Sequence, residues 1–454
     1  MPMQAQAKPK TLKKRAFAAS RWALVGHLSS QAIRFGGNLI LTRLLVPEMF
    51  GVMAIVNAIM TGLSMISDIG ISQNVVQNKR GEDPVFLNTV WTIQILRGIS
   101  VCGLVLLTSF GLYQANVLGF IPQTMVYANK DLPFLLGIIA MGVFISSFNS
   151  IHLILLNRKL QLGKSVFIEI TSQILGLAVI IYIAWHERTV YALASGNIVT
   201  STTKLLLSHL IIKERCRFAW DKETVTDIAH FGRWILVSSI LGFLFNQGDR
   251  LLLGAFITPE LLGVYTVAFF LANAVKDVLS KLLSSVFYPV LSDTVRNRPE
   301  RLKQVYYKIR HRIDAVAMFS SGFLFTAGGR VVDLLYDDRY HEAGWMLQIL
   351  ALSMASVGFT LAGQCFMAHG RSAMFTLMVG SQTLALYTTL PLAYMEYGLR
   401  GAIWAIACTP LIRLVISGIF MKIHFFFHLG KELLMLPMLF LGAYLGKLAA
   451  GIYF

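Results

Sequence analysis

Thirteen long apolar runs constrain the fold of this chain more than any other feature of its sequence. They lie at 21–45, 50–71, 88–113, 133–156, 166–185, 190–212, 234–257, 262–288, 314–336, 345–368, 372–395, 401–421 and 433–454. A helix needs about 20 apolar residues to cross the hydrocarbon core of a bilayer, and nearly all of these runs are that long. The runs are continuous rather than alternating, which excludes a membrane β-barrel. We therefore predict an all-α polytopic membrane protein.

Composition supports this class and excludes a soluble enzyme. Charged residues make up only 14% of the chain, whereas soluble domains average about 25%. The last run, 433–454, is the weakest candidate for a span because it contains Pro437 and Lys447. We predict twelve core spans and a probable thirteenth, with an interfacial or half-inserted segment as the alternative for the last run.

The excess of positive charge indicates an orientation in the membrane. The chain has 40 Lys and Arg residues against 23 Asp and Glu, a net charge of +17. In a soluble protein such a balance would suggest a nucleic-acid partner. If the N-terminus is cytoplasmic and the runs alternate, 26 Lys and Arg residues fall inside and five outside. This matches the positive-inside rule, so we predict a cytoplasmic N-terminus and no nucleic-acid partner.

An internal repeat relates the first and seventh runs. Residues 21–55 and 233–267 align without a gap, with 11 identities in 35 positions that include Arg-Trp, Pro-Glu and Gly-Val pairs. Six runs separate the copies, so both halves enter the membrane in the same direction, as in transporters with parallel repeats. We predict two six-helix lobes with a site between them; a duplicated channel or scaffold is the alternative. The predicted parts are a basic cytoplasmic tail (1–20), an N-lobe (21–212), a cytoplasmic linker (213–233), a C-lobe (234–421) and a C-terminal extra span (422–454).

Polar residues within the runs are candidate site residues. A charged side chain in hydrocarbon is costly, so it must face protein or a water-filled cavity. Five polar residues of the first run, from His27 to Thr42, share one helical face, and three residues of the seventh run, from Ser239 to Arg250, lie on the matching face. The predicted cavity residues are His27, Gln31, Arg34, Asn38, Arg97, Asn246, Arg250, Lys276, Arg330 and Arg413. For Arg330 and Arg413, which lie near helix ends, the alternative is that they extend toward the membrane surface.

Two carboxylates in the runs are candidates for ion coupling. These are Asp249 and Asp277. The alternative is that they form internal ion pairs with Arg250 and Lys281. The predicted cavity contains more arginine than carboxylate, and arginine binds phosphate oxygens with two parallel hydrogen bonds. We therefore predict an anionic cargo, with phosphate or diphosphate as the leading group.

Motifs for nucleotides, metals and cofactors are absent from the sequence. It has no GxxxxGK[ST], no GxGxxG and no HExxH string, and its four cysteines form no CxxC pair. We predict no cofactor, no metal and no enzymatic activity. The basic segment 291–312 resembles an amphipathic helix on the cytoplasmic leaflet, where it would contact anionic membrane lipids; ordinary loop charge is the alternative.

Three strings resemble those of a known family. They are NLILTRLLVPEMFG (Asn38–Gly51), SDIGISQNVVQ (Ser67–Gln77) and FYPVLSD (Phe287–Asp293). The corner at Arg43–Gly51 is the most specific of them. Together with the number and order of the runs, they resemble the bacterial polysaccharide transporter family of Wzx-type flippases. That family belongs to the MOP superfamily, which also contains MATE drug exporters and lipid II flippases.

The resemblance implies a V-shaped, MATE-like bundle in the bacterial inner membrane. Such a protein would move an undecaprenyl-diphosphate-linked oligosaccharide by alternating access, for exopolysaccharide or O-antigen synthesis. Its implied partners are the lipid-linked oligosaccharide, membrane lipids, and the polysaccharide polymerase and chain-length machinery. The alternative functions are a MATE-like ion-coupled antiporter for small molecules and a non-transporting assembly scaffold. MATE exporters usually have an acidic residue in the N-lobe cavity, where this chain has His27 and Arg34, which disfavours a cationic cargo.

Overall fold

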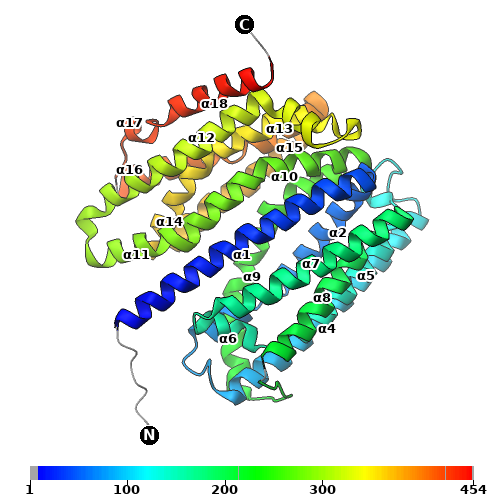
Figure 1. Cartoon of the computed structure of the whole chain (residues 1–454), viewed down its shortest axis with the longest axis vertical. Helices are drawn as coiled ribbons and strands as arrows, with labels where there is room; N and C mark the ends of the chain where they lie inside the picture. The colour runs from blue at the N-terminus through cyan, green and yellow to red at the C-terminus, as the bar shows by residue number, and fades with distance from the viewer. Residues whose placement is uncertain (1–8, 213, 425, 452–454) are drawn as a thin grey trace. The chain divides into compact units, whose positions relative to one another are not determined.

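Each predicted apolar run coincides largely with helix in the computed structural model (Figure 1). The structure describes residues 9–212, 214–424 and 426–451, and within these residues it contains helices and no strand. The chain divides into two compact units. Unit 1 comprises the described residues of Met1–Leu44, Ile59–Phe120 and Lys130–Ile240, and unit 2 those of Leu45–Ala58, Ile121–Asn129 and Leu241–Phe454.

The α-helices follow the order of the predicted runs. Those of unit 1 are α1 (Pro9–Leu44), α3 (Ile71–Gln77), α4 (Pro84–Val117), α5 (Leu132–Ser147), α6 (His152–Arg158), α7 (Leu162–Glu187) and α8 (Tyr191–Ile211). Helices α2 (Pro47–Ile66) and α9 (Lys222–Gly254) contribute residues to both units. Those of unit 2 are α10 (Pro259–Leu282), α11 (Tyr288–Asn297), α12 (Leu302–Leu335), α13 (Ala343–Ala351), α14 (Thr360–Ala368), α15 (Ser372–Cys408), α16 (Leu411–His424), α17 (Leu429–Glu432) and α18 (Leu436–Ala449).

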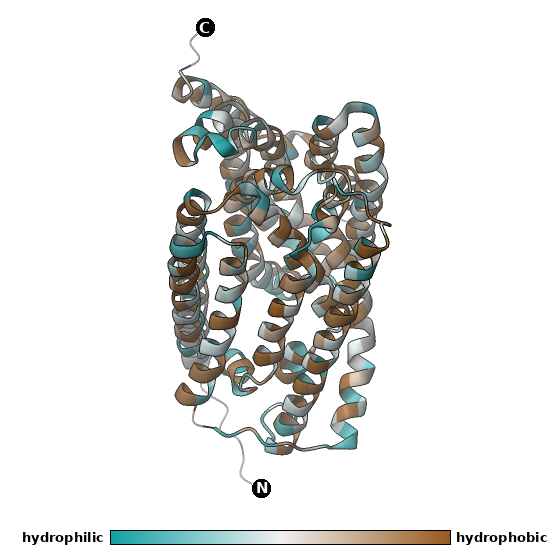
Figure 2. Ribbon diagram, turned by 90° about the vertical axis from the view of Figure 1, so that its right-hand side faces the viewer, coloured by the Kyte–Doolittle hydropathy of each residue, from teal (hydrophilic) through white to brown (hydrophobic). Residues whose placement is uncertain are grey.

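Helix length and hydropathy show a multi-pass membrane protein. Eight helical stretches of the described residues are long and apolar enough to cross a bilayer, or nine if the bent pair α5–α6 is counted as one. One of the eight, Ala373–Ile423, contains two predicted runs, so the count of twelve spans and a thirteenth stays a prediction. Figure 2 shows apolar residues along most helices. Large apolar side chains are also exposed, such as Leu334 at 78% and Met395 at 76%, and such a surface requires lipid rather than water.

The two copies of the repeated corner contact each other within unit 2. Each copy begins a helix with proline, Pro47 in α2 and Pro259 in α10, and a glutamate follows in the first turn. Both residues suit a helix start, because proline lacks the N–H that would be unpaired there and a carboxylate complements the helix dipole. A Cβ on Gly51 would overlap the carbonyl oxygen of Pro259, and a Cβ on Gly263 would overlap that of Pro47. The glycines of the repeat thus allow the two helices to approach backbone to backbone.

The last helix packs along α12, beside which it lies in Figure 1. Gly322 on α12 faces the backbone of α18 at Leu439, and Gly442 on α18 faces the backbone of α12 at Phe319. The hydroxyl of Thr326 donates a hydrogen bond to the carbonyl of Ala443 at 3.0 Å. Small residues with close backbone contact are typical of helix pairs in membranes.

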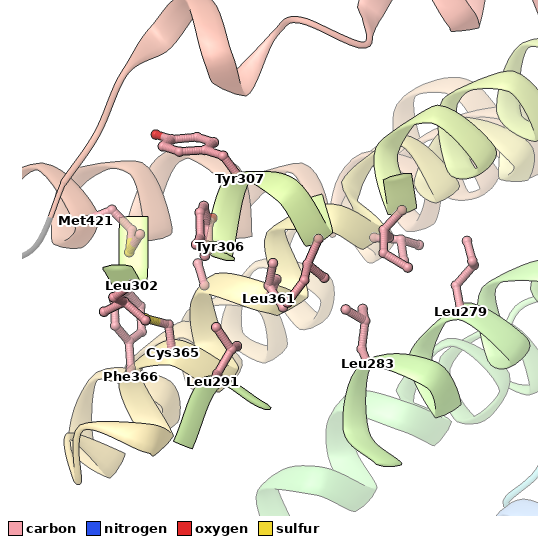
Figure 3. Close-up of a cluster of buried hydrophobic side chains, with 14 of the residues drawn as sticks. Leu279, Leu283, Leu291, Leu302, Tyr306, Tyr307, Leu361, Cys365, Phe366 and Met421 are labelled. Carbon is pink, nitrogen blue, oxygen red and sulfur yellow. The ribbon is translucent and has the colours of Figure 1, made fainter. Parts of the chain in front are cut away.

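The basic segment 291–312 differs from the prediction of one lipid-facing helix. Its first residues end α11, and α12 begins at Leu302 and continues to Leu335. Arg310 is 0% exposed, so this member of the predicted surface cluster lies in the core of unit 2. Figure 3 shows that core, where Tyr306 of α12 lies near Cys365 and Phe366 of α14. The prediction was wrong for Arg310, because one buried cation cannot be distinguished from its neighbours in a run of cations.

Alternate residues of the linker that follows α8 form hydrogen bonds with α4. The backbone N–H groups of Arg217, Ala219 and Asp221 donate to side chains of α4, at 2.9, 3.2 and 3.2 Å. The Asp221 carboxylate accepts hydrogen bonds from Thr224 and Arg80. The Thr224 hydroxyl and the Arg80 guanidinium hold the pKa of Asp221 below its usual range. These contacts fix the start of α9 to unit 1.

Candidate functional site

A polar stripe on α10 forms one wall of a cavity in unit 2. Asn273, Lys276, Asp277 and Ser280 follow one another at spacings of three, one and three residues, so they share a helical face. All four line a cavity of about 420 Å³. Lys276 and Asp277 are sequence-predicted site residues, and the structure brings them to the same cavity.

Helices α9 and α16 provide the other two charged residues of this cavity wall. Asn246 and Asp249 of α9 and Arg413 of α16 line the same cavity, so five of the twelve predicted site residues meet here. Arg413 donates to the Thr360 hydroxyl at 2.7 Å and to the Gln382 side-chain oxygen at 3.0 Å. The guanidinium is therefore held by α14 and α15.

The internal ion pairs given as the alternative for the two carboxylates do not form among the described residues. Asp249 accepts a hydrogen bond from the Tyr265 hydroxyl, and Arg250 donates to Gln247 at 2.7 Å. The Arg250 guanidinium lies 4.8 Å from the ring centroid of Phe269, a residue of the cavity wall. No ion pair joins Asp277 to Lys281 within the distance that defines the other pairs of the described residues.

The cavity of unit 2 carries charges of both signs in equal number. Its wall carries two cations, Lys276 and Arg413, and two carboxylates, Asp249 and Asp277. Arg250 lies behind Phe269 rather than in the wall. The cavity therefore has cations for an anionic group and carboxylates for a cation in the same space. The sequence analysis missed the hydroxyl residues of the wall, which are Ser353, Ser356, Thr360 and Thr409. The clustering of Ser353, Ser356 and Thr360 in the run 345–368 was the available signal.

A second polar cavity, of about 440 Å³, lies in unit 1. The predicted residue Arg97 lines it, together with Gln94 and Lys204. Arg97 donates to the carbonyl of Ser64 at 2.7 Å and to the Ser67 hydroxyl at 3.2 Å, which ties its guanidinium to the end of α2. Lys204 bonds the Glu169 carboxylate at 2.6 Å. The pair was not among the predicted site residues, although a lysine and a glutamate in successive apolar runs were the signal for it.

The polar face of α1 lines neither cavity. His27, Gln31, Arg34 and Asn38 are absent from both walls. Helix α1 instead packs on α7 through a different face: the Ser30 hydroxyl donates to Gln173, and Gly37 faces Leu177. Arg34 is exposed, and so is Arg330 on α12, which also lines neither cavity. The structure of the separate units does not bring these five residues together.

Metal ligands are not grouped in the part of the chain that the structure describes. There, no set of three or more His, Cys, Asp or Glu side chains lies close enough to hold a metal ion. All four cysteines are free.

Comparison with known proteins identifies the family. The family model described as "Polysaccharide biosynthesis protein" matches residues 40–345. The lipopolysaccharide biosynthesis protein WzxC of Escherichia coli is 20% identical over 365 residues, which cover 80% of this chain and 71% of that protein. The succinoglycan biosynthesis transport protein ExoT of Rhizobium meliloti is 19% identical over 332 residues, 73% of this chain and 65% of that protein.

The fold is shared with solved transporter structures. The lipid II flippase MurJ in an inward closed conformation has a TM-score of 0.73 at 12% identity, covering 94% of this chain and 97% of that chain. An inward-facing MATE transporter of the MOP superfamily has a TM-score of 0.60 at 15% identity, covering 91% and 95%. The resemblance to Wzx-type proteins is therefore confirmed, and the likeness to the MurJ and MATE structures shows a shared fold. Because the family model matches about two thirds of its residues, the chain belongs to the polysaccharide biosynthesis protein family.

Proposed function

We propose that this protein is a flippase that moves an undecaprenyl-diphosphate-linked oligosaccharide across the bacterial inner membrane, for exopolysaccharide or O-antigen synthesis. The observation that carries the proposal is a polar cavity with Lys276 and Arg413, in an apolar-surfaced unit of a polysaccharide biosynthesis protein. The relatives WzxC and ExoT are named for lipopolysaccharide and succinoglycan biosynthesis. The released cargo would pass to the polysaccharide polymerase and chain-length machinery.

The proposed architecture has two lobes of six spans, at 21–212 and 234–421, and an extra span at 422–454. The repeat of 21–55 and 233–267 supports this division, as does the reciprocal contact of Gly51 and Gly263 with the two corners. The distribution of Lys and Arg supports a cytoplasmic N-terminus. Alternating access between these lobes would expose the polar faces of α1 and α9 to the cargo, with Arg34 and Arg250 as its cationic contacts.

In the proposed mechanism the cavity of unit 2 binds the negatively charged part of the cargo. An ammonium and a guanidinium in a space surrounded by apolar helices attract an anion more strongly than they would in water. The Arg413 guanidinium is already oriented by Thr360 and Gln382, so little freedom is lost when an anion binds. Asp249 and Asp277 would bind a coupling cation or proton while the anionic group is absent.

Removing the charge of Lys276 tests this mechanism. We expect Lys276→Met to lower polysaccharide export by roughly tenfold, because a hydrogen bond to a charged group contributes about 1.5–3 kcal/mol. Lys276→Arg, which keeps the charge, should retain more export than Lys276→Met. The measurement is export in a strain without its own copy of the gene, normalised to the amount of protein in the membrane.

The matched control is Lys281→Met, which removes a lysine from the same helix but outside the cavity wall. We expect its export to equal that of the wild type. Wild-type export from Lys276→Met at normal abundance would contradict the assignment of the cavity. Accumulation of lipid-linked sugar in the variant distinguishes a flippase from a MATE-like antiporter, which would instead change drug tolerance.

A further inference from the structure

A third cavity, of about 300 Å³, lies in unit 1 where α6, α7 and the end of α8 meet, and neither the proposed transport path nor the core accounts for it. One part of its wall is apolar and consists of Leu155, Leu156, Ile211 and Ile212. The other part is polar and consists of His152, Lys159, Gln161, Lys164 and Glu214. A cavity with an apolar side and a cationic side fits a ligand that is itself amphipathic.

The polar side carries a net positive charge. Lys159 and Lys164 supply two cations. The only carboxylate of the wall, Glu214, lies 3.2 Å from His152 Nε2, so it is already engaged. The side chain of Glu214 is 60% exposed, whereas that of His152 is 11% exposed. The carboxylate therefore lies at the rim of a wall that carries the two lysines.

The start of α7 adds to this positive potential. Gln161 precedes α7 and makes no side-chain hydrogen bond to its first turn, which contains no acidic residue. Helices usually have an acceptor there, because the first N–H groups lack partners within the helix and carry partial positive charge. In this helix the first turn instead contains Lys164. Leu160, in the preceding turn, has a φ of 56°, a conformation that is costly for a branched side chain.

The apolar side continues onto the outer surface of α8. Leu206 is 56% exposed and Leu210 is 71% exposed; they lie one turn apart on α8, and Leu210 directly precedes the wall residue Ile211. Beneath the cavity, Leu156, Ile168 and Ile212 form a buried apolar cluster. An acyl chain that leaves the cavity would thus meet apolar side chains along α8, whereas a free phosphate ion would use only the cationic side.

We propose that this cavity binds the headgroup of an anionic phospholipid. The phosphate lies between Lys159 and Lys164 at the start of α7, and the glycerol and first acyl carbons lie against Leu156 and Ile211. Lysine ammonium groups bind phosphate oxygens as point charges, so the site selects for net negative charge rather than for one headgroup shape. This binding site is separate from the cavity proposed for the cargo.

The test measures lipid binding to the purified full chain. The double variant Lys159→Gln, Lys164→Gln is compared with the wild type by native mass spectrometry, with phosphatidylglycerol, phosphatidylcholine and inorganic phosphate as probes. We expect the wild type to retain phosphatidylglycerol in preference to phosphatidylcholine. The double variant should bind phosphatidylglycerol roughly tenfold more weakly, because it lacks two charged hydrogen-bond donors.

Two further variants keep the result interpretable. Lys79→Gln, Lys130→Gln removes two exposed lysines of unit 1 outside the cavity, and we expect wild-type lipid binding. Lys159→Arg, Lys164→Arg keeps both charges and should restore binding, which a merely misfolded site would not allow. Equal phosphatidylglycerol binding by the wild type and the glutamine variant overturns the proposal. Displacement of the lipid by an equal concentration of inorganic phosphate overturns it too, because the site would then recognise phosphate alone.

Discussion

Arg310→Met should destabilise the protein by about 3–5 kcal/mol, the usual cost of removing one partner from a buried ion pair. Arg310 is fully buried in unit 2 between two carboxylates. It lies 3.0 Å from Asp314 and 2.7 Å from Glu432, which are 1% and 4% exposed at their side chains. The guanidinium also stacks over the Phe359 ring at 3.8 Å and donates to the Tyr306 hydroxyl at 2.9 Å. Without it, two carboxylates remain in a space without a compensating cation.

The same contact joins the end of the chain to the core. Glu432 ends α17, directly before α18, so its bond to Arg310 attaches the C-terminal helices to α12. We therefore expect Arg310→Met to lower the thermal unfolding temperature in detergent by several degrees and to reduce the amount of protein in the membrane. The unfolding temperature is measured by intrinsic tryptophan fluorescence. The amount of protein is measured by size-exclusion chromatography of the solubilised membranes.

Two variants control for other causes. Arg312→Met removes an exposed cation two residues further along α12, and we expect a change within about 0.5 kcal/mol. The neutral triple variant Arg310→Met, Asp314→Asn, Glu432→Gln should recover much of the lost stability, because no uncompensated charge is then buried. Equal unfolding temperatures for Arg310→Met and Arg312→Met would contradict the buried ion-pair cluster.

Arg310 also shows where sequence analysis reaches its limit. The segment Lys303–Arg312 contains five basic side chains in ten residues, a pattern typical of a surface helix. Only packing against Phe359 and α17 selects one of them for the core. No local feature carries that information, because the partners Asp314 and Glu432 include a residue more than 100 positions away.

Helical spacing in the sequence accounts for only part of the cavity of unit 2. The stripe from Asn273 to Ser280 lies on one helix, so its spacings of three and four residues place it on one face. The residues that close the cavity, such as Thr360 and Arg413, come from other helices. Neutral polar side chains are common in helices that cross membranes, and only the tertiary structure shows which of them meet. Likewise, α1 has the predicted polar face, yet that face borders neither cavity.

Substitutions at the reciprocal corner of the repeat should have the second large effect. Gly263→Leu is expected to destabilise the protein by more than the about 1–3 kcal/mol that overpacking usually costs. A Cβ at Gly263 would overlap the backbone carbonyl of Pro47, and the backbone nitrogen of Gly51 is also within 4 Å. Backbone atoms at the start of two helices cannot rotate away as a side chain does. The helices α2 and α10 would have to separate, which would uncover their buried apolar residues.

A helical glycine outside the corner provides a control for glycine-to-alanine substitutions. Gly380→Ala lies in α15 where a Cβ would meet no atom within 4 Å, so we expect unchanged or slightly raised stability, because alanine favours helix over glycine by up to about 1 kcal/mol. Gly263→Ala and Gly51→Ala should each lower the unfolding temperature. A Gly263→Ala protein as stable as Gly380→Ala would contradict the close backbone contact.

The double variant Gly51→Ala, Gly263→Ala tests whether the two contacts form one structural unit. Each substitution forces the same pair of helices apart, since Gly51 faces Pro259 on α10 and Gly263 faces Pro47 on α2. Once one alanine has separated them, the second requires little additional movement. We therefore expect a loss of stability clearly smaller than the sum of the two single losses, as for neighbouring residues that share one displacement. Strict additivity would mean that the two copies of the corner act independently, although they contact each other reciprocally.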